Sequence, residues 1–119
     1  MKLTEAEWAV LDVLWSEERF ALGEITKALL AVKGWNKNTV HTYLTRMEKK
    51  GLVKIDRSKE QPYSANVSKE ECAKEERTEL LQKVYGGAAG DLISAFLKET
   101  KISKKEVEKL RKLLDDMEV

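Results

Sequence analysis

The sequence predicts a mainly helical protein in two parts: three helices with a two-stranded β-hairpin, and then a helical tail. Apolar residues recur at helical spacing over most of the 119 residues. Residues typical of helix caps stand before several of these segments. The spacing changes to strict alternation only in one short region, where the hairpin is expected.

The composition is that of a charge-rich soluble protein of one domain, or one domain with a small appendage. Charged residues make up 36% of the chain and hydrophobic residues 42%, and no apolar run approaches the roughly 18 residues of a membrane span. The N-terminal stretch MKLTEAEW does not resemble a secretory signal, because acidic residues and a tryptophan interrupt it. We therefore expect a cytoplasmic protein that makes no membrane contact.

The first helix is predicted at about residues 5–17 and the second at about 22–33. Thr4 and Glu7 have the T-x-x-E spacing of a capping box, in which the threonine oxygen accepts a free amide hydrogen and the glutamate reaches back to the cap. The apolar spacing of the second segment indicates a buried face made of Ile25, Ala28, Leu29 and Val32.

A tight turn leads to a third helix, predicted at about residues 37–50. Gly34 permits the left-handed backbone that ends the second helix, and Asn36 is the expected cap of the third. After Gly51, the stretches LVKIDR and YSANV alternate, with RSKEQP between them as a turn. Their apolar face must pack on the helices, because a lone hairpin is only marginally stable in water.

The rest of the chain predicts three more helices, at about 69–85, 88–99 and 104–117. Ser68 and Ser103 each precede a glutamate at capping-box spacing. The stretch KEECAKEERTE after Ser68 is nearly all polar, which is typical of a connector surrounded by solvent. We therefore divide the chain into domains 1–68 and 69–119.

The third predicted helix has an unusual polar face. On a wheel of about 100° per residue, short hydrogen-bonding side chains and cations lie within roughly 60° of Thr42, opposite Val40, Leu44 and Met47. Such a strip suits the major groove of DNA, because short side chains let the helix approach base edges and an arginine can fork onto guanine. The residues of this helix that we predict to bind DNA include His41 on the flank of the strip. The full set is Asn38, Thr39, His41, Thr42, Thr45, Arg46 and Lys49.

Positive charge is concentrated in this region. Residues 33–59 carry eight basic and two acidic side chains, a net charge of +6, whereas the whole chain carries +1. Cations on the hairpin can bind the phosphate backbone of DNA without reading its sequence. The hairpin cations are Lys54, Arg57 and Lys59, and we expect Lys50 to bind phosphate in the same way. A helix-turn-helix followed by a basic hairpin is the arrangement of a winged helix.

Nothing in the sequence indicates an enzyme or a cofactor site. The chain has one histidine, one cysteine, no glycine-rich phosphate loop and no acidic cluster with metal-ligand spacing. We therefore expect no catalysis, no cofactor and no bound metal, and a buried thiol at Cys72. The main alternative to DNA binding is a winged-helix protein-interaction module that uses the same helix face on an acidic partner.

Several stretches of the sequence resemble the penicillinase repressor family, which includes the methicillin-resistance repressor and copper-responsive repressors. They are LTEAEWAVLDVLW, NTVHTYLTRMEKKGLV, YSANVSKEE and VYGGAAGDLISAFLKETKISKKEVEKLRKLLDD. The resemblance implies a homodimeric repressor that binds a palindromic operator, often built from TACA and TGTA half-sites, and dimerises through its C-terminal helices.

The resemblance also implies how repression ends. In beta-lactam-responsive members, a membrane sensor linked to a protease triggers a cut that matches the bond between Ala95 and Phe96; those members carry asparagine where this chain has Ala95. Copper-responsive members end in a cysteine-rich hook, and no cysteine follows Cys72 here. Release by a small effector in the dimer core is the alternative to cleavage. Position 21, usually a serine cap in the family, is Ala21.

The tail predicts a dimer on physical grounds as well. About 50 residues are few for a separate core, so the apolar faces of the tail need a partner surface. The polar first half of the connector disfavours folding back onto the first domain, and we expect a second copy to supply that surface. The predicted interface residues are Leu80, Leu81, Val84, Tyr85, Leu92, Ile93, Phe96, Leu97, Leu110, Leu113 and Leu114.

Overall fold

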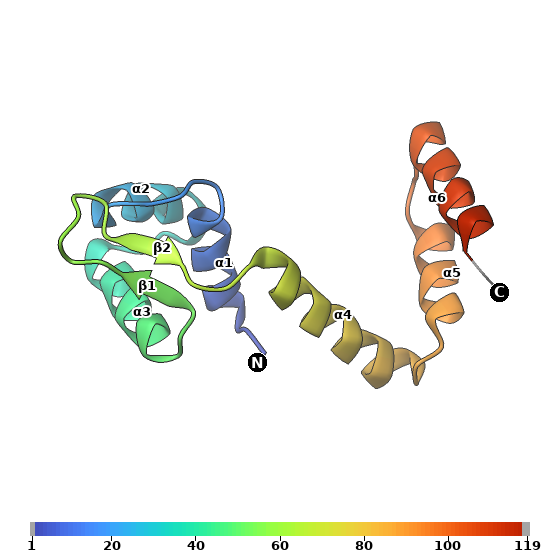
Figure 1. Cartoon of the computed structure of the whole chain (residues 1–119), viewed down its shortest axis with the longest axis horizontal. Coiled ribbons are helices and arrows are strands. Elements are labelled where there is room, and N and C mark those ends of the chain that lie inside the picture. Colours follow the sequence, from blue (N-terminus) through green and yellow to red (C-terminus); the bar gives the residue numbers. More distant parts are fainter. Residues whose placement is uncertain (1, 118–119) are drawn as a thin grey trace. The chain divides into compact units, whose positions relative to one another are not determined.

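The computed structural model describes residues 2–117. Within that range the chain is mainly helical, with one two-stranded antiparallel sheet, and it divides into two compact units, the first ending at Arg77 and the second beginning at Thr78. The elements are α1 (Glu5–Leu14), α2 (Leu22–Lys33), α3 (Lys37–Lys49), β1 (Val53–Ile55), β2 (Tyr63–Ala65), α4 (Lys69–Tyr85), α5 (Ala89–Glu99) and α6 (Lys104–Asp116) (Figure 1).

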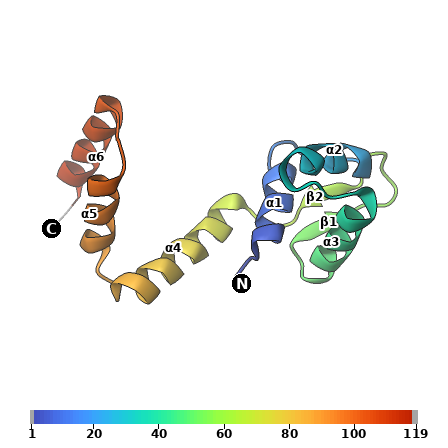
Figure 2. The ribbon, with the colours of Figure 1, turned by 180° about the vertical axis from the view of Figure 1, so that it is seen from behind.

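The first unit is a winged helix whose three helices and hairpin enclose one hydrophobic core (Figure 2). Each helix contributes an apolar stripe, as the helical spacing predicts. Removing these side chains from water stabilises the unit by roughly 1.5–3 kcal/mol for each large one. The side chains with almost no exposure are Val10, Leu11, Leu14, Ile25, Leu29, Val40, Leu44, Met47 and Val53.

The predicted caps are present at the helix starts. Thr4 Oγ1 accepts a hydrogen bond from the Glu7 amide at 3.2 Å, and Glu7 Oε1 accepts one from the Thr4 amide at 2.9 Å, which completes the capping box. Gly34 has a φ of 69°, the left-handed conformation that ends α2. Asn36 Oδ1 accepts from the Thr39 amide at 2.9 Å and so caps α3.

Two sequence predictions about the first helices are wrong. Helix α1 ends at Leu14 and not near residue 17. Just after its end, the Ser16 hydroxyl donates to the Val13 carbonyl at 2.6 Å, and the helix makes no further turn. In α2, Ala28 is exposed and Val32 is 71% exposed. The buried stripe of α2 is therefore narrow, and Val32 lies at the rim of a hollow between α1 and α2.

The hairpin is held in place by a third segment that the sequence analysis missed. Strand β1 pairs with β2 in antiparallel register, with Val53 opposite Ala65 and Ile55 opposite Tyr63. Phe20 extends this sheet, because its amide donates to the Tyr63 carbonyl at 2.8 Å and its carbonyl accepts from the Tyr63 amide at 3.0 Å. The hairpin thus has a partner on its outer edge as well as the core beneath it.

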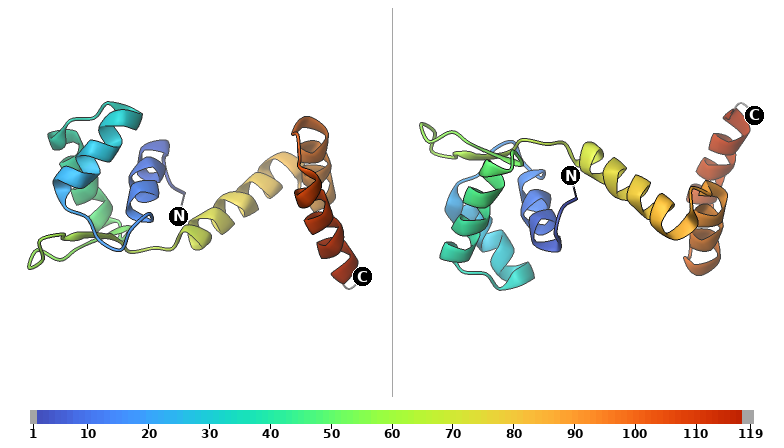
Figure 3. Two further views of the ribbon diagram at one scale, coloured as in Figure 1. Left: turned by 90° about the horizontal axis from the view of Figure 1, so that it is seen from above. Right: turned by 90° about the horizontal axis from the view of Figure 1, so that it is seen from below.

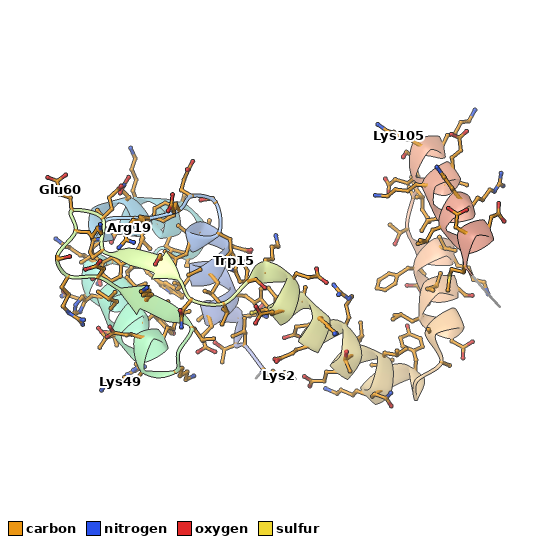
Figure 4. All side chains as sticks on the ribbon, in the orientation of Figure 1. Lys2, Trp15, Arg19, Lys49, Glu60 and Lys105 are labelled. Carbon is orange, nitrogen blue, oxygen red and sulfur yellow. The ribbon has the colours of Figure 1, made fainter. Side chains whose placement is uncertain are left out.

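The first half of α4 belongs to the first unit and is not a solvated connector. Cys72 is 7% exposed, and the Trp8 Nε1–H donates to Glu76 Oε1 at 3.3 Å. Just before the helix, the Trp15 Nε1–H donates to the Val67 carbonyl at 2.9 Å (Figure 4). The division between the units therefore lies inside α4, after Arg77, and later than the predicted boundary after residue 68.

The second unit contains the end of α4 together with α5 and α6. Gly86 and Gly87 have φ values of 56° and 90°, which separate α4 from α5 as the Gly-Gly pair predicts. Ser103 Oγ accepts from the Glu106 amide at 3.2 Å and caps α6. Neither α5 nor α6 contains a buried residue, although both are strongly amphipathic. Their apolar faces are therefore at least partly exposed in a single copy of the chain.

Candidate nucleic-acid interface

The polar strip predicted on the third helix lies on the exposed side of α3. Asn38, Thr42 and Arg46 are exposed together with the flanking residue His41, and the opposite side of the helix is buried in the core. Lys49 is exposed at the C-terminal end of the same helix (Figure 4). The two strip residues that are only half exposed are Thr39 and Thr45.

The threonine hydroxyls of this strip have a defined hydrogen-bonding state. Thr42 Oγ1 donates to the Asn38 carbonyl at 2.9 Å, and Thr45 Oγ1 donates to the His41 carbonyl at 3.0 Å. Each hydroxyl proton is thus used within the helix, and the oxygen retains lone pairs that can accept a hydrogen bond. In this state the two threonines are suited to amino groups of adenine or cytosine more than to phosphate oxygens.

An aromatic pair fixes the turn before α3. The rings of Trp35 and Tyr43 are stacked, with centroids 4.6 Å apart and planes inclined by 16°. Trp35 lies in the turn and Tyr43 on the flank of α3. Offset stacking of this kind contributes roughly 0.5–1.5 kcal/mol beyond the buried area, so it helps to hold the turn against the helix.

The hairpin places two of its three predicted cations free of ion pairs. Lys54 and Lys59 are exposed and form no salt bridge within residues 2–117. Arg57 is also exposed, but its guanidinium donates to both carboxylate oxygens of Glu48 on α3, each at 3.2 Å. This pair raises the pKa of Arg57, first through the hydrogen bond and then through the charge of Glu48. The hairpin and α3 lie next to each other (Figure 3).

Lys50 differs from its predicted role, because it forms an internal ion pair. Its Nζ lies 2.9 Å from Oε2 of Glu7, whose residue is only 4% exposed. Burial raises the pKa of Glu7, but the hydrogen bonds from Lys50 and Thr4 lower it by more, and its pKa lies below the usual value. Lys50 therefore ties the end of α3 to the start of α1.

The predicted dimer residues are only partly covered in a single chain. Among its exposed members, the exposed fraction of the residue ranges from 39% at Leu80 to 60% at Leu113 and Leu114. Val84, Ile93, Phe96 and Leu97 are also exposed, whereas the half-buried members of the set are Leu81, Tyr85, Leu92 and Leu110.

The predicted cleavage bond lies inside a helix. Ala95 and Phe96 are both within α5, and Phe96 is 57% exposed. A protease that cut this bond would need local opening of α5, which has no buried residue to oppose it.

Three other features bear on function within the described residues: possible metal sites, possible membrane-spanning helices and the thiol of Cys72. Residues 2–117 contain no group of three His, Cys, Asp or Glu side chains placed to hold a metal ion. None of the helices in that range has the length and apolar character needed to cross a membrane. Burial raises the pKa of the Cys72 thiol, with smaller contributions from Glu75 and Glu71, so the unreactive protonated form is favoured.

Comparison with known proteins gives relatives that match along almost the whole chain. The family model described as "Penicillinase repressor" matches residues 3–116. The penicillinase repressor of Staphylococcus aureus is 29% identical over 118 residues, which cover 98% of this chain and 94% of that protein. The methicillin resistance regulatory protein MecI of Staphylococcus aureus (strain N315) is 28% identical, with 96% and 94% covered.

Two further similarities are more distant. The penicillinase repressor of Bacillus licheniformis is 23% identical, with 97% of this chain and 91% of that protein covered. Among solved structures, a MarR/EmrR family transcriptional regulator from Acinetobacter sp. ADP1 aligns with a TM-score of 0.42 and 20% identity, over 97% of this chain and 78% of that one. Because the family model spans nearly all of the sequence, the chain belongs to the penicillinase repressor family, a family of transcriptional repressors and not of enzymes.

Proposed function

We propose that this protein is a homodimeric, sequence-specific repressor that binds a palindromic DNA operator, of the type built from TACA and TGTA half-sites. It would act in the cytoplasm, where bacterial DNA lies. The observation that supports this most is the exposed polar strip of α3, which faces away from the core while the unpaired cations of the hairpin lie beside it.

In this proposal α3 enters the major groove, which is about 12 Å wide and admits one helix. Arg46 donates to guanine O6 and N7, and Thr42 and Thr45 accept from base amino groups through their free lone pairs. Asn38, Thr39 and His41 line the same groove, and Lys49, Lys54 and Lys59 contact phosphates. The short side chains at the centre of the strip allow the close approach that base readout requires.

The second unit supplies the proposed dimer contact. Its helices α5 and α6 have no buried residue, and Phe96, Leu113 and Leu114 are each more than half exposed. A second copy could cover these faces by twofold pairing, as closed homodimers commonly do. Two linked DNA-binding units would then bind DNA about 10²–10⁴ times more tightly than one unit.

Release from DNA follows from the same arrangement. Anything that separates the two C-terminal tails removes the avidity and so frees the operator. Cleavage by a sensor-linked protease at the bond between Ala95 and Phe96 would do this, and so would a small effector that enters the dimer core. The exposed position of Phe96 on a helix without buried residues is compatible with either route.

The experiment that tests the proposed function is selection of duplexes from a random DNA library by the full chain. We expect enrichment of a two-fold symmetric sequence, with two chains bound per selected duplex by sedimentation. Recovery of no symmetric sequence, together with tight capture of an acidic protein, would instead identify a protein-interaction module.

A further inference from the structure

We propose that Glu48 is a positioning residue, which fixes the hairpin against α3 through its ion pair with Arg57. This inference rests on the proposed function, because it concerns how the two DNA-contacting elements are held in one geometry. It gives Arg57 a role that differs from the predicted phosphate contact: Arg57 would act on DNA only indirectly, by setting where Lys54 and Lys59 lie.

The ion pair has the geometry that restrains an arginine most. Nη1 and Nη2 of Arg57 each lie 3.2 Å from a different carboxylate oxygen of Glu48, so the contact is bidentate. Glu48 lies near the end of α3, and Arg57 is the second residue of the loop between the two strands. The side chain of Glu48 is 31% exposed and that of Arg57 is 70% exposed, so the pair is a surface contact that joins the helix to the hairpin.

The opposite end of the loop is also fixed. Arg19 Nε donates to the Gln61 carbonyl at 2.8 Å, and Gln61 Nε2 donates to Glu24 Oε1 on α2 at 2.8 Å (Figure 4). Between these ends, Asp56 Oδ1 accepts from the Ser58 amide and hydroxyl at 3.2 and 2.6 Å. The loop is therefore tied to α2 on one side, and the Glu48 pair is its tie to α3 on the other.

The position of the acidic residue Glu48 beside the proposed DNA-binding surface can be explained in two ways. The carboxylate of Glu48 would repel phosphates, so simple electrostatics expects its removal to tighten binding to every DNA. A brace expects the opposite: with a loose hairpin, Lys59 and Lys54 must lose conformational freedom on binding, and less of the contact energy appears as affinity for any duplex. The two interpretations therefore differ in the sign of the effect on affinity.

The chain provides a matched control for charge. Glu60 is exposed at the tip of the same loop and forms no ion pair or hydrogen bond within residues 2–117 (Figure 4). Glu60→Gln removes one negative charge near the same phosphates and leaves the brace intact. Glu48→Gln removes one negative charge and the brace together, so the difference between the two variants isolates the brace.

The experiment measures two quantities on full-length wild type, Glu48→Gln and Glu60→Gln. The first is the affinity for the selected palindrome and for a random duplex of equal length. The second, which needs no DNA, is the ¹⁵N order parameter of residues 57–60. Thermal unfolding of each variant confirms that the fold is retained.

We expect Glu48→Gln to lower both affinities about two- to fivefold, the range that an exposed ion pair can supply, and to lower the order parameters. Glu60→Gln should tighten binding to both duplexes and leave the order parameters as in wild type. Adding Arg57→Gln to Glu48→Gln should lower the affinities no further, because the pair acts as a unit.

The brace is refuted if Glu48→Gln behaves like Glu60→Gln in both measurements. A further loss in the double variant, for both duplexes alike, would show that Arg57 contacts phosphate directly. If the wild type itself does not distinguish the palindrome from the random duplex, the proposed function fails, while the order parameters still decide whether the brace exists.

Discussion

Glu7 shows how one buried carboxylate can serve several parts of the fold. Glu7 Oε1 accepts a hydrogen bond from the Thr4 amide at the start of α1, and Glu7 Oε2 accepts one from Lys50 Nζ at the end of α3. Lys50 is half exposed, so its charge is not fully removed from water, whereas the Glu7 side chain is only 5% exposed. The contact therefore sets where α3 ends relative to α1.

Glu7→Gln should lower the free energy of unfolding by about 1–3 kcal/mol at pH 7, because it removes a buried charged acceptor of two hydrogen bonds. The folded-state pKa of Glu7 lies below its unfolded value, so the stabilisation is present above the unfolded pKa and disappears as pH falls through the folded pKa. Urea titrations at pH 7 and near pH 3 measure this difference. Glu5→Gln, at an exposed position of the same helix, is the control and should change little.

Arg46 is the residue of α3 that should contribute most to sequence preference. It is exposed in the C-terminal half of the strip and forms no ion pair within residues 2–117. If it forks onto guanine, Arg46→Ala should cost about 1–3 kcal/mol of operator-binding free energy and relax the preference at one base pair. Fluorescence anisotropy on operators with single base changes measures this. An equal loss on all sequences would make Arg46 a phosphate contact only.

At the scale of elements, α2 begins with an incomplete cap. The backbone of Ala21 has the extended conformation of an N-cap, with φ −88° and ψ 157°, but its side chain has no oxygen to accept an amide hydrogen. Glu24 Oε1 already accepts from the Ala21 amide at 2.8 Å, so half of a capping box is in place.

Ala21→Ser should therefore stabilise the protein, because the added hydroxyl can accept from the Glu24 amide. The expected gain in the free energy of unfolding is about 0.5–2 kcal/mol. Chemical denaturation measures it, with Ala28→Ser on the exposed side of the same helix as the control. Stability no higher than that of the control would show that the cap geometry does not accept serine.

The hairpin should contribute affinity without sequence preference. Lys59→Ala is expected to weaken binding to operator and random duplexes alike, and to reduce the slope of log affinity against log salt by about one. Salt titrations of both duplexes measure this. A loss confined to the operator would place Lys59 against a base.

Local signals explain why most elements could be predicted from the sequence. The starts of α1, α3 and α6 depend on cap residues within three positions of the helix, and Gly34 ends α2 through its own backbone. What could not be predicted depends on partners far away in the chain. Phe20 pairs with Tyr63 across more than forty residues, and no local pattern signals that contact.

The same distinction applies to the candidate site. The polar strip follows from the helical period alone, and the structure places its residues on one exposed face of α3. The pairing of Lys50 with Glu7, and of Arg57 with Glu48, depends on how helices and hairpin pack. A count of cations in the sequence therefore overestimates those that are available to DNA.

Tight binding to the proposed operator should require two copies of the chain. Phe96→Asp would place a charge on an apolar face of α5 that is uncovered in one chain, so it should leave the fold of that chain intact and oppose pairing. We expect sedimentation to show a monomer, and operator affinity to fall by about 10²–10⁴. Ser94→Asp, at an exposed polar position of the same helix, is the charge control and should remain dimeric.

The most direct test of the central claim is the affinity of the full chain for the selected palindrome and for the same duplex with one half-site scrambled. Because two copies of α3 should read the two half-sites, we predict that scrambling one of them lowers affinity at least a hundredfold, and that two chains leave the intact duplex together. Equal affinity for the two duplexes, with one chain bound to each, would contradict the account.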